Sequence, residues 1–429
     1  MRSHRPHRWL GYALLGAAFG LGILGGVAGA LGAATRISSP PVFLGAGCIA
    51  GAMIAAGLAY PAARALRHSR RLRTAVVMAA VVALVLASLT APLFYPPLTD
   101  PVPPESRALP PGATRWTLAT GSEVAVLRVQ GRGAPTRPPI VFLHGGPGGF
   151  SVGLAPTVEA ISTLAEDGHD LYFYDQVGGG LSARLADVTE YSLERHLADL
   201  EAVIARIGSD QVVLIGSSFG STLGAHYISR HPDQVARAVF SGASALFAPA
   251  WRASGTGSLD DSMSPGERRR FSEAIEKPRL FAAIALAQLN PRAAARFAPE
   301  AELGAFFDEV ANAFYLPLTV CRGSTPRVRS SGYGFWSNRI TGASLARSDD
   351  DPRPRLRTVA TPVLVLRGAC DYKKEAVARE YAEVFPEARF VQLEGAGHMP
   401  YLDALDPYLA EVRPFLQAPA RSLQPPPGL

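Results

Sequence analysis

Ser218 is the residue whose surroundings in this sequence best suit nucleophilic chemistry. It stands at the centre of Gly216-Ser-Ser-Phe-Gly220, after an apolar strand-like run and before a helical stretch that ends at His231-Pro232. A sharp turn from strand to helix would lift the serine hydroxyl above a sheet, and the two glycines would permit the strained backbone and close packing. We therefore expect Ser218 to be a nucleophile that faces the positive end of a helix dipole.

A histidine and an aspartate that could activate this serine follow it in the chain. Asp371 ends the strand-and-loop segment 363–371, and His398 ends the Gly-rich segment 390–398. In this order His398 would take the proton from Ser218 as general base. Asp371 would hold the imidazole in one tautomer and stabilise its charged form. Glu394 and Asp403 are the alternative candidates for the acid.

An acyl-transfer serine also needs donors for the oxyanion that forms when it attacks a carbonyl carbon. The strand-like segment 139–143 runs into His144-Gly-Gly-Pro-Gly-Gly149, whose amides can face a pocket because no side chains intervene. We assign the oxyanion hole to the backbone N–H groups of Gly146 and Phe219. Such a loop could instead bind phosphate. It lacks, however, the Gly-Lys-Ser/Thr ending of a P-loop and the glycine spacing of a dinucleotide-binding motif. We expect no cofactor and no metal.

Short β-branched segments alternate with helical ones in the second part of the chain, which predicts a largely parallel sheet with crossover helices. Residues 193–207 have helical spacing of apolar side chains after the capping residue Ser192. The strand rhythm stops at 245–359, where helical stretches at 271–289 and 300–314 predict an inserted cap. The expected core is 114–244 with 360–417, between a Pro-rich linker (100–113) and a loose tail (418–429). The expected strands are 124–129, 139–143, 171–174, 212–215, 238–240, 363–366 and 390–393.

The first 99 residues contain three long stretches without a charged side chain, at 9–35, 37–63 and 74–99. Each is long enough for a helix to cross a bilayer, which takes about 20 apolar residues. Prolines in the second stretch place its expected helix at 42–61. The first stretch could instead be a signal peptide, but its apolar part is too long for one and two more spans follow.

Arginines set the expected orientation of these spans. Three precede the first span, five lie between the second and the third, and only Arg36 lies between the first and the second. The positive-inside rule then places the N-terminus in the cytoplasm, and three crossings leave everything after about residue 98 on the outer face. We expect a multi-pass cell-membrane protein with an extracytoplasmic catalytic domain and the lipid bilayer as a partner.

The net charge of +6 does not indicate a nucleic-acid partner. Nine of the 42 basic residues and no acidic residue precede Thr74, which leaves 33 basic against 36 acidic residues in the rest of the chain. The excess of basic residues therefore comes from the arginines around the expected membrane spans and reflects membrane topology.

Three cysteines give little information. Cys48 lies within the second apolar stretch, whereas Cys321 and Cys370 fall in the outer part of the chain, where oxidation is permitted. The latter two could pair or remain as buried free thiols.

Four segments together resemble the proline iminopeptidase branch of the α/β-hydrolases. They are His144-Gly-Gly-Pro-Gly-Gly149, Asp175-Gln-Val-Gly-Gly-Gly-Leu-Ser182, Gly216-Ser-Ser-Phe-Gly-Ser221 and Gly397-His398. The resemblance covers roughly residues 114–416. It implies an α/β-hydrolase fold with an inserted helical cap, here preceded by three transmembrane helices. The implied activity is that of a serine hydrolase, an aminopeptidase that forms an acyl-enzyme with a small-molecule or short-peptide substrate.

The same resemblance implies the roles of five residues. Ser218, Asp371 and His398 would form the Ser-His-Asp triad. The amides of Gly146 and Phe219 would form the oxyanion hole.

The sequence departs from the family pattern at two positions. The residue after the nucleophile is Phe219, where the family usually has Trp. The cap of the family often carries a glutamate that grips the free amine of the substrate, and here Ala311 stands in its place. Other acids of the cap could substitute for it: Glu300, Glu302, Asp308 and Glu309.

The missing glutamate and the membrane region keep a second interpretation open, an esterase or lipase-like hydrolase of small esters or lipids. A third interpretation, a non-enzymatic binding module, is disfavoured by the intact set of Ser, Asp and His. Dehalogenases and epoxide hydrolases are disfavoured because their nucleophile is an aspartate, whereas position 218 is Ser.

Overall fold

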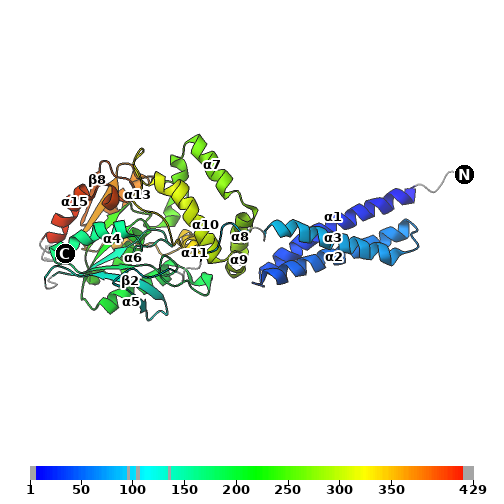
Figure 1. The fold of residues 1–429 in the computed structure, drawn as a ribbon, viewed down its shortest axis with the longest axis horizontal. Coiled ribbons are helices and arrows are strands. Elements are labelled where there is room, and N and C mark those ends of the chain that lie inside the picture. Colours follow the sequence, from blue (N-terminus) through cyan, green and yellow to red (C-terminus); the bar gives the residue numbers. More distant parts are fainter. Residues whose placement is uncertain (1–5, 94–96, 103–106, 134–136, 419–429) are drawn as a thin grey trace. The chain divides into compact units, whose positions relative to one another are not determined.

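The computed structural model describes residues 6–93, 97–102, 107–133 and 137–418 of the 429-residue chain. The chain forms two compact units (Figure 1). One contains residues 1–100 and 275–303, and the other contains residues 101–274 and 304–429. The first hundred residues thus share a unit with a segment that lies far away in the sequence.

The larger unit is built on a mixed eight-stranded sheet in the order β1-β2-β4-β3-β5-β6-β7-β8 (Figure 1). β2 pairs antiparallel with β1 and β4, and all other neighbours are parallel. Parallel strands end at the same edge of a sheet, so the loops that follow them meet there. The strands are β1 (Ala113–Thr117), β2 (Glu123–Val129), β3 (Ile140–Leu143), β4 (Leu171–Tyr174), β5 (Val212–Ser217), β6 (Val235–Ser241), β7 (Val363–Gly368) and β8 (Ala388–Leu393).

Apolar side chains alternate along the central strands and fill one core on each face of the sheet. On β5, Val212 and Leu214 belong to one core, and Val213 and Ile215 belong to the other. Helices cover both faces, as a parallel sheet requires. The first core includes α5 (Leu193–Ile207), α6 (Phe219–Arg230) and α13 (Glu375–Val384), and the second includes α4 (Ala155–Ser162), α14 (Pro400–Asp403) and α15 (Leu405–Gln417).

All seven expected strands are present, with ends that differ by up to three residues from the prediction. The expected helix at 193–207 is also confirmed, and the Ser192 hydroxyl caps it by accepting the Arg195 amide N–H at 3.1 Å. The additional strand β1 was not predicted. It is a five-residue edge strand on which Arg115 and Thr117 are exposed, so it lacks the apolar alternation of a core strand.

Helices are inserted between β6 and β7, as expected, but two of them differ from the prediction. The helical stretch expected at 271–289 is divided into two helices, because Pro278 has no amide N–H to continue a helix and instead begins a new one. The expected helix 300–314 ends early, at Val310, and continues as a π-helical turn, Ala311–Tyr315. The inserted helices are α7 (Pro265–Ile275), α8 (Pro278–Leu289), α9 (Pro291–Phe297), α10 (Glu300–Val310), α11 (Phe335–Ala346) and α12 (Arg353–Leu356).

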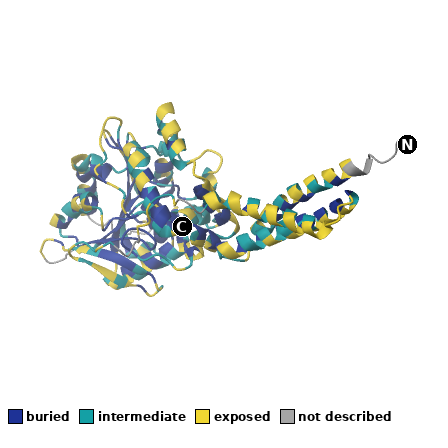
Figure 2. Cartoon of the chain, turned by 45° about the vertical axis from the view of Figure 1, so that its right-hand side comes forward, coloured by how far each residue is buried: buried dark blue, intermediate teal, exposed yellow. Residues whose placement is uncertain are grey.

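In the smaller unit, the long helices α1 (Pro6–Ala34), α2 (Pro40–Ala65) and α3 (Arg71–Thr90) lie side by side (Figure 1). Their apolar spans have mean hydropathies of 2.0, 2.1 and 2.4. Much of their surface is exposed (Figure 2), and it includes large apolar side chains such as Leu24 and Leu84, which are 66% and 68% exposed. These helices are long and apolar enough to cross a membrane.

The bounds of two of these helices differ from the prediction. The expected helix 42–61 is too short, because α2 begins at Pro40 and continues to Ala65 with Pro61 inside it. Proline is tolerated in the first turn of a helix, where its missing N–H would have no partner. The third apolar stretch is helical only as far as Thr90 and then forms the 3-10 turn η1 (Ala91–Leu93).

Helices α1 and α2 approach each other through glycines. A Cβ on Gly47 would lie 2.6 Å from the Gly26 carbonyl oxygen, and one on Gly51 would lie 2.6 Å from that of Gly22. Both helices therefore present two small residues four positions apart at their contact. This pattern is typical of helices that associate within lipid, where close packing replaces the hydrophobic effect.

We expect Gly220→Ala to prevent stable folding and Gly342→Ala to be neutral or slightly stabilising. Both glycines lie within helices, α6 and α11 respectively. A Cβ at Gly220 would lie 2.0 Å from the Leu143 carbonyl oxygen of β3, whereas nothing lies within 4 Å of one at Gly342. Without a clash, alanine in a helix is favoured over glycine by about 1 kcal/mol. Apparent unfolding midpoints measured at one scan rate test this pair, and equal midpoints would contradict the close packing of α6 on β3.

Candidate active site

The turn between β5 and α6 holds Ser218 in a strained backbone conformation. Its φ and ψ are 54° and −119°, and among the described non-glycine residues only Arg67 also has a positive φ. The Ser218 amide donates to the Ser241 carbonyl at 2.9 Å, and its own carbonyl accepts the Ser221 amide N–H at 2.9 Å. The sharp strand-to-helix turn predicted at Ser218 is therefore confirmed.

Asp371 and His398 form a buried pair after β7 and β8. The His398 Nδ1 lies 2.8 Å from Asp371 Oδ1, which also accepts the Lys373 amide N–H at 2.9 Å. Burial pushes the pKa of the Asp371 carboxyl upward, but the charge and the hydrogen bond of His398, with the Lys373 amide, hold the pKa below its ordinary value. An ionised Asp371 fixes the proton of His398 on Nδ1 and leaves Nε2 as the nitrogen that can accept one.

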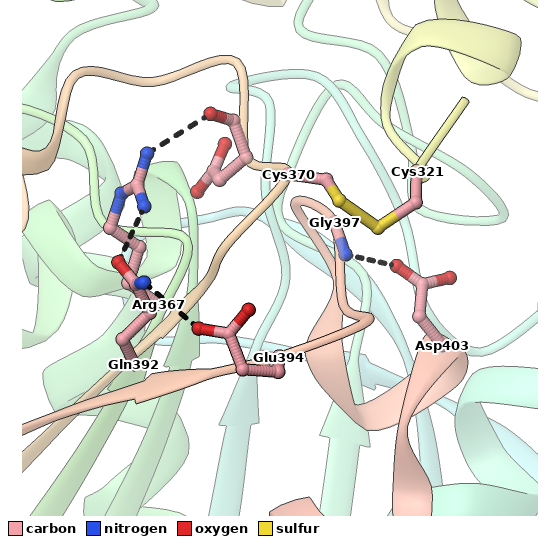
Figure 3. Close-up of a disulfide and its surroundings, with 8 residues drawn as sticks. Cys321, Arg367, Cys370, Gln392, Glu394, Gly397 and Asp403 are labelled. Carbon is pink, nitrogen blue, oxygen red and sulfur yellow. Dashed lines mark hydrogen bonds between the residues drawn. A yellow bond between two sulfur atoms is a disulfide. The ribbon is translucent and has the colours of Figure 1, made fainter.

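The two alternative acids have other partners. Glu394 accepts a hydrogen bond from the Gln392 amide at 3.1 Å, and Asp403 accepts the Gly397 backbone N–H at 2.9 Å (Figure 3). Asp403 therefore shapes the loop before His398, whereas Asp371 contacts the imidazole itself.

A disulfide joins Cys321 to Cys370 (Figure 3), which answers the question that the sequence leaves open. Cys370 directly precedes Asp371, and Cys321 lies two residues after Thr319. The Thr319 carbonyl accepts the His398 backbone N–H at 2.7 Å. The cross-link thus connects the segment that carries the carboxylate to the segment that holds the backbone of the histidine.

Ser218 and His398 line the same cavity, which has a volume of about 370 Å³. The walls are mostly apolar and aromatic, and all of the lining residues belong to the larger unit. The Ser218 hydroxyl lies 3.4 Å from that of Ser244. The other lining residues include Gly145, Gly146, Phe150, Leu259, Ala311, Tyr315, Leu316, Thr319, Arg329, Tyr333, Asn338, Tyr372 and Tyr401.

The two residues expected to form the oxyanion hole belong to different elements. Gly146 lines the cavity from the glycine-rich loop after β3. Phe219 is the first residue of α6, and its ring is buried edge-on against His196, with 5.7 Å between the ring centroids. Only the backbone of Phe219 is therefore available for chemistry beside Ser218.

Asp175 is a structural residue of the site whose role sequence reasoning missed. Its Oδ1 accepts the backbone N–H groups of Ser151 and Val152 at 2.6 and 2.9 Å, and its Oδ2 accepts that of Leu181 at 2.9 Å. The carboxylate thus ties the end of the glycine-rich loop to the loop after β4. The Asp-Gln-x-Gly-x-Gly-x-Ser pattern marked this residue, but only the fold shows what it binds.

His144 holds the other end of the glycine-rich loop. Its Nδ1 lies 2.7 Å from the Gly145 carbonyl oxygen, and its Nε2 accepts the Gln176 backbone N–H at 2.9 Å. Complete burial lowers the pKa of this imidazole, which favours the neutral form that the two hydrogen bonds require. His144 therefore lines the cavity as a fixed, uncharged support of the loop that carries Gly146.

Apart from Arg329, the inserted segment lines the cavity with uncharged side chains. Ala311, which the sequence resemblance predicts at the position of the family glutamate, lines it together with Tyr315 and Tyr333. Asn338 of α11 donates to the Pro147 carbonyl at 2.8 Å and so holds the glycine-rich loop from the opposite side. None of the described lining residues is Asp or Glu, and one, Arg329, is an arginine.

The four acids considered as substitutes for the family glutamate lie outside this lining. Asp308 accepts hydrogen bonds from the Ser330 hydroxyl at 2.5 Å and the Tyr333 amide at 3.1 Å, and Glu302 forms a buried ion pair with Arg279. Glu309 lines a separate hollow, and Glu300 begins α10. Asp308 and Glu309, the two acids of this set that belong to the larger unit, therefore do not line the cavity.

Several known proteins are similar to this chain. A model of the alpha/beta hydrolase fold family matches residues 138–405. The chain is 24% identical over 306 residues to a proline iminopeptidase of Heyndrickxia coagulans, covering 70% of this chain and 96% of the relative. A proline iminopeptidase of Lactobacillus delbrueckii subsp. bulgaricus is 26% identical over 292 residues, with 67% and 92% covered. The crystal structure of a proline iminopeptidase of Mycobacterium smegmatis aligns with a TM-score of 0.46 and 23% identity, with 71% and 97% covered.

The family model covers more than half of the chain, and the chain therefore belongs to the α/β-hydrolase family, in which it is proline iminopeptidase-like.

Proposed function

We propose that the protein is a membrane-anchored, proline iminopeptidase-like serine hydrolase that forms an acyl-enzyme on Ser218. The observation that carries this proposal is the buried Asp371–His398 pair, at 2.8 Å, beside a cavity that also contains the strained Ser218. A left-handed serine between a strand and a helix costs folding energy, and such strain is characteristic of functional sites.

The proposed reaction has two steps. In the first step, the Ser218 Oγ attacks the substrate carbonyl carbon while His398 Nε2 accepts the Ser218 hydroxyl proton. The resulting imidazolium then donates this proton to the leaving group. Asp371 stabilises the imidazolium, and the amides of Gly146 and Phe219 stabilise the oxyanion. In the second step His398 activates water, which hydrolyses the ester on Ser218 and frees the enzyme.

We expect Ser218→Ala to lower kcat by at least about 10³-fold, because no other nucleophile would form the acyl-enzyme. The variant should also lose covalent labelling by a fluorophosphonate probe. Ser244→Ala is the matched control, since its hydroxyl lies only 3.4 Å from that of Ser218 yet follows a different strand. Labelling that survives in Ser218→Ala and disappears in Ser244→Ala would transfer the nucleophile role to Ser244.

The residues that line the cavity bear on which class of substrate the enzyme would accept. The relatives are proline iminopeptidases, which favours short peptides or aminoacyl derivatives as substrates. The described lining, however, has no carboxylate to pair with a free N-terminal amine. We infer that selection for a free amine is weak. The second candidate function, hydrolysis of small esters or lipids, rests on this same observation.

We expect the wild-type protein to cleave an N-acetylated aminoacyl ester nearly as well as the free-amine form. A buried carboxylate that pairs with an ammonium contributes about 1.5–3 kcal/mol, which corresponds to roughly 10- to 100-fold in preference. The measurement is kcat/KM for the matched substrates on one preparation. A large preference for the free amine would instead show that another acid binds it.

Ala311→Glu provides the complementary test, because it places a carboxylate in the cavity lining. It should raise the preference for the free amine by about tenfold or more. Ala313→Glu is the matched control, since Ala313 lies in the same π-helical turn but is exposed and does not line the cavity. An equal change in both variants would attribute the effect to net charge rather than to contact with the substrate.

We further propose that α1, α2 and α3 span the cell membrane and place the hydrolase unit outside the cytoplasm. The arginine asymmetry, the exposed apolar helix faces and the disulfide support this orientation, because disulfides persist in oxidising compartments. A reporter fused after Leu429 should behave as exported, and one fused after Arg70 should behave as cytoplasmic. The opposite pair of activities would reverse the topology.

A further inference from the structure

The segment 275–303 belongs in sequence to the insertion between β6 and β7, but it folds with the three long helices. It contains α8, α9 and the first residues of α10. Part of the insertion between β6 and β7 therefore belongs to the smaller unit, together with α1, α2 and α3.

Two hydrogen bonds attach this segment to the ends of α1 and α3. The Asn290 side chain donates to the carbonyl of Ala34, the last residue of α1, at 2.9 Å. The Arg279 Nη1 donates to the carbonyl of Leu93, which ends the turn after α3, at 2.7 Å. Because α1 and α3 leave the apolar span at these residues, α8 and α9 lie at the level where the helices would exit the bilayer.

The one charged side chain of α8 is neutralised inside the unit. Arg279 is buried and donates from Nε and Nη2 to the two carboxylate oxygens of Glu302, at 2.6 and 2.8 Å. Its Nη2 also donates to the Phe297 carbonyl at 2.8 Å, and its guanidinium lies over the Phe297 ring. The Leu98 amide donates to the same Glu302 carboxylate at 2.9 Å, so this ion pair also holds the chain that follows α3.

The opposite face of α8 is apolar and exposed. Phe281 and Leu289 are 54% and 46% exposed, and they lie eight positions apart, on the same side of the helix. Ala285 is exposed and Ile284 is partly exposed between them, and Gln288 is the only polar residue of this stripe. Both faces of α8 are thus apolar, whereas a helix at a protein–water boundary normally carries charged residues on its outer face.

We propose that α8 is an interfacial helix whose stripe of Phe281, Ile284, Ala285 and Leu289 inserts into the outer leaflet of the bilayer. Helices of this kind sit about 5–10 Å into the boundary between headgroups and acyl chains. The exposed basic residues Lys277 and Arg296 lie on either side of α8 in sequence, where they can meet lipid phosphates. The occupant is lipid because α8 shares a unit with the three long apolar helices and lies where hydrogen bonds hold the segment to the ends of α1 and α3. The inference rests on the membrane anchoring proposed above.

The test is site-directed spin labelling of the full-length protein in phosphatidylcholine–phosphatidylglycerol nanodiscs, in a Cys48→Ser background that keeps the Cys321–Cys370 disulfide. Labels are placed by Phe281→Cys and Leu289→Cys. Leu84→Cys, at a 68% exposed position of α3, is the lipid reference, and Ala205→Cys, on the exposed face of α5, is the water reference. Collisions of the label with molecular oxygen and with a water-soluble nickel chelate are then compared.

Labels at 281 and 289 should collide often with oxygen and rarely with nickel, at a shallower depth than the label at 84. Nickel accessibility equal to that at 205 would place the stripe in water, and low accessibility to both reagents would place it against protein. Either result overturns the proposal while the label at 84 remains in lipid. Nickel-accessible label at 84 would overturn the membrane anchoring itself. Quenching of Phe281→Trp fluorescence by brominated lipid gives a second measurement if a label disturbs folding.

Discussion

The arrangement of the site depends on one backbone constraint, the left-handed conformation of Ser218 at the end of β5. The chain must turn there within a single residue, so α6 begins directly against β3, and the contact leaves no room for a side chain at Gly220. Position 218 therefore projects into the cavity from a point that two central elements hold fixed. The loops after β3, β4, β7 and β8 must then be placed around this point, and each is held by its own hydrogen bonds.

These surrounding loops are held mainly by buried polar groups that bind backbone amides. Asp175 binds three amide groups of two loops, and His144 bridges the loops after β3 and β4 as a neutral imidazole. A carboxylate that accepts several N–H bonds stabilises a loop that has few side chains of its own. The glycine-rich loop has few side chains of its own near the cavity, and hydrogen bonds from these neighbours, together with close backbone packing at Gly148 and Gly149, hold it in place.

Much of this architecture could be predicted from the sequence, because it is carried by local patterns. The apolar runs of β3, β5 and β7, and the order of Ser218, Asp371 and His398, are visible without any structure. The roles of Asp175 and His144 were not, since their partners are backbone amides of other loops. The division of the insertion was not predicted either, because Asn290 and Arg279 reach the ends of α1 and α3 across more than 180 residues of sequence.

The disulfide between Cys321 and Cys370 has a consequence for how the protein responds to proteases. The cysteines are 49 residues apart, and the segment just after Cys321 is exposed at Arg322, Gly323, Ser324 and Thr325. Exposed loops of small polar residues are preferred sites of nicking. A single cut after Arg322 would divide the polypeptide between Ser218 and His398, yet the two fragments would stay covalently joined. Such a nicked molecule would migrate as one species on a non-reducing gel and separate into two only after reduction.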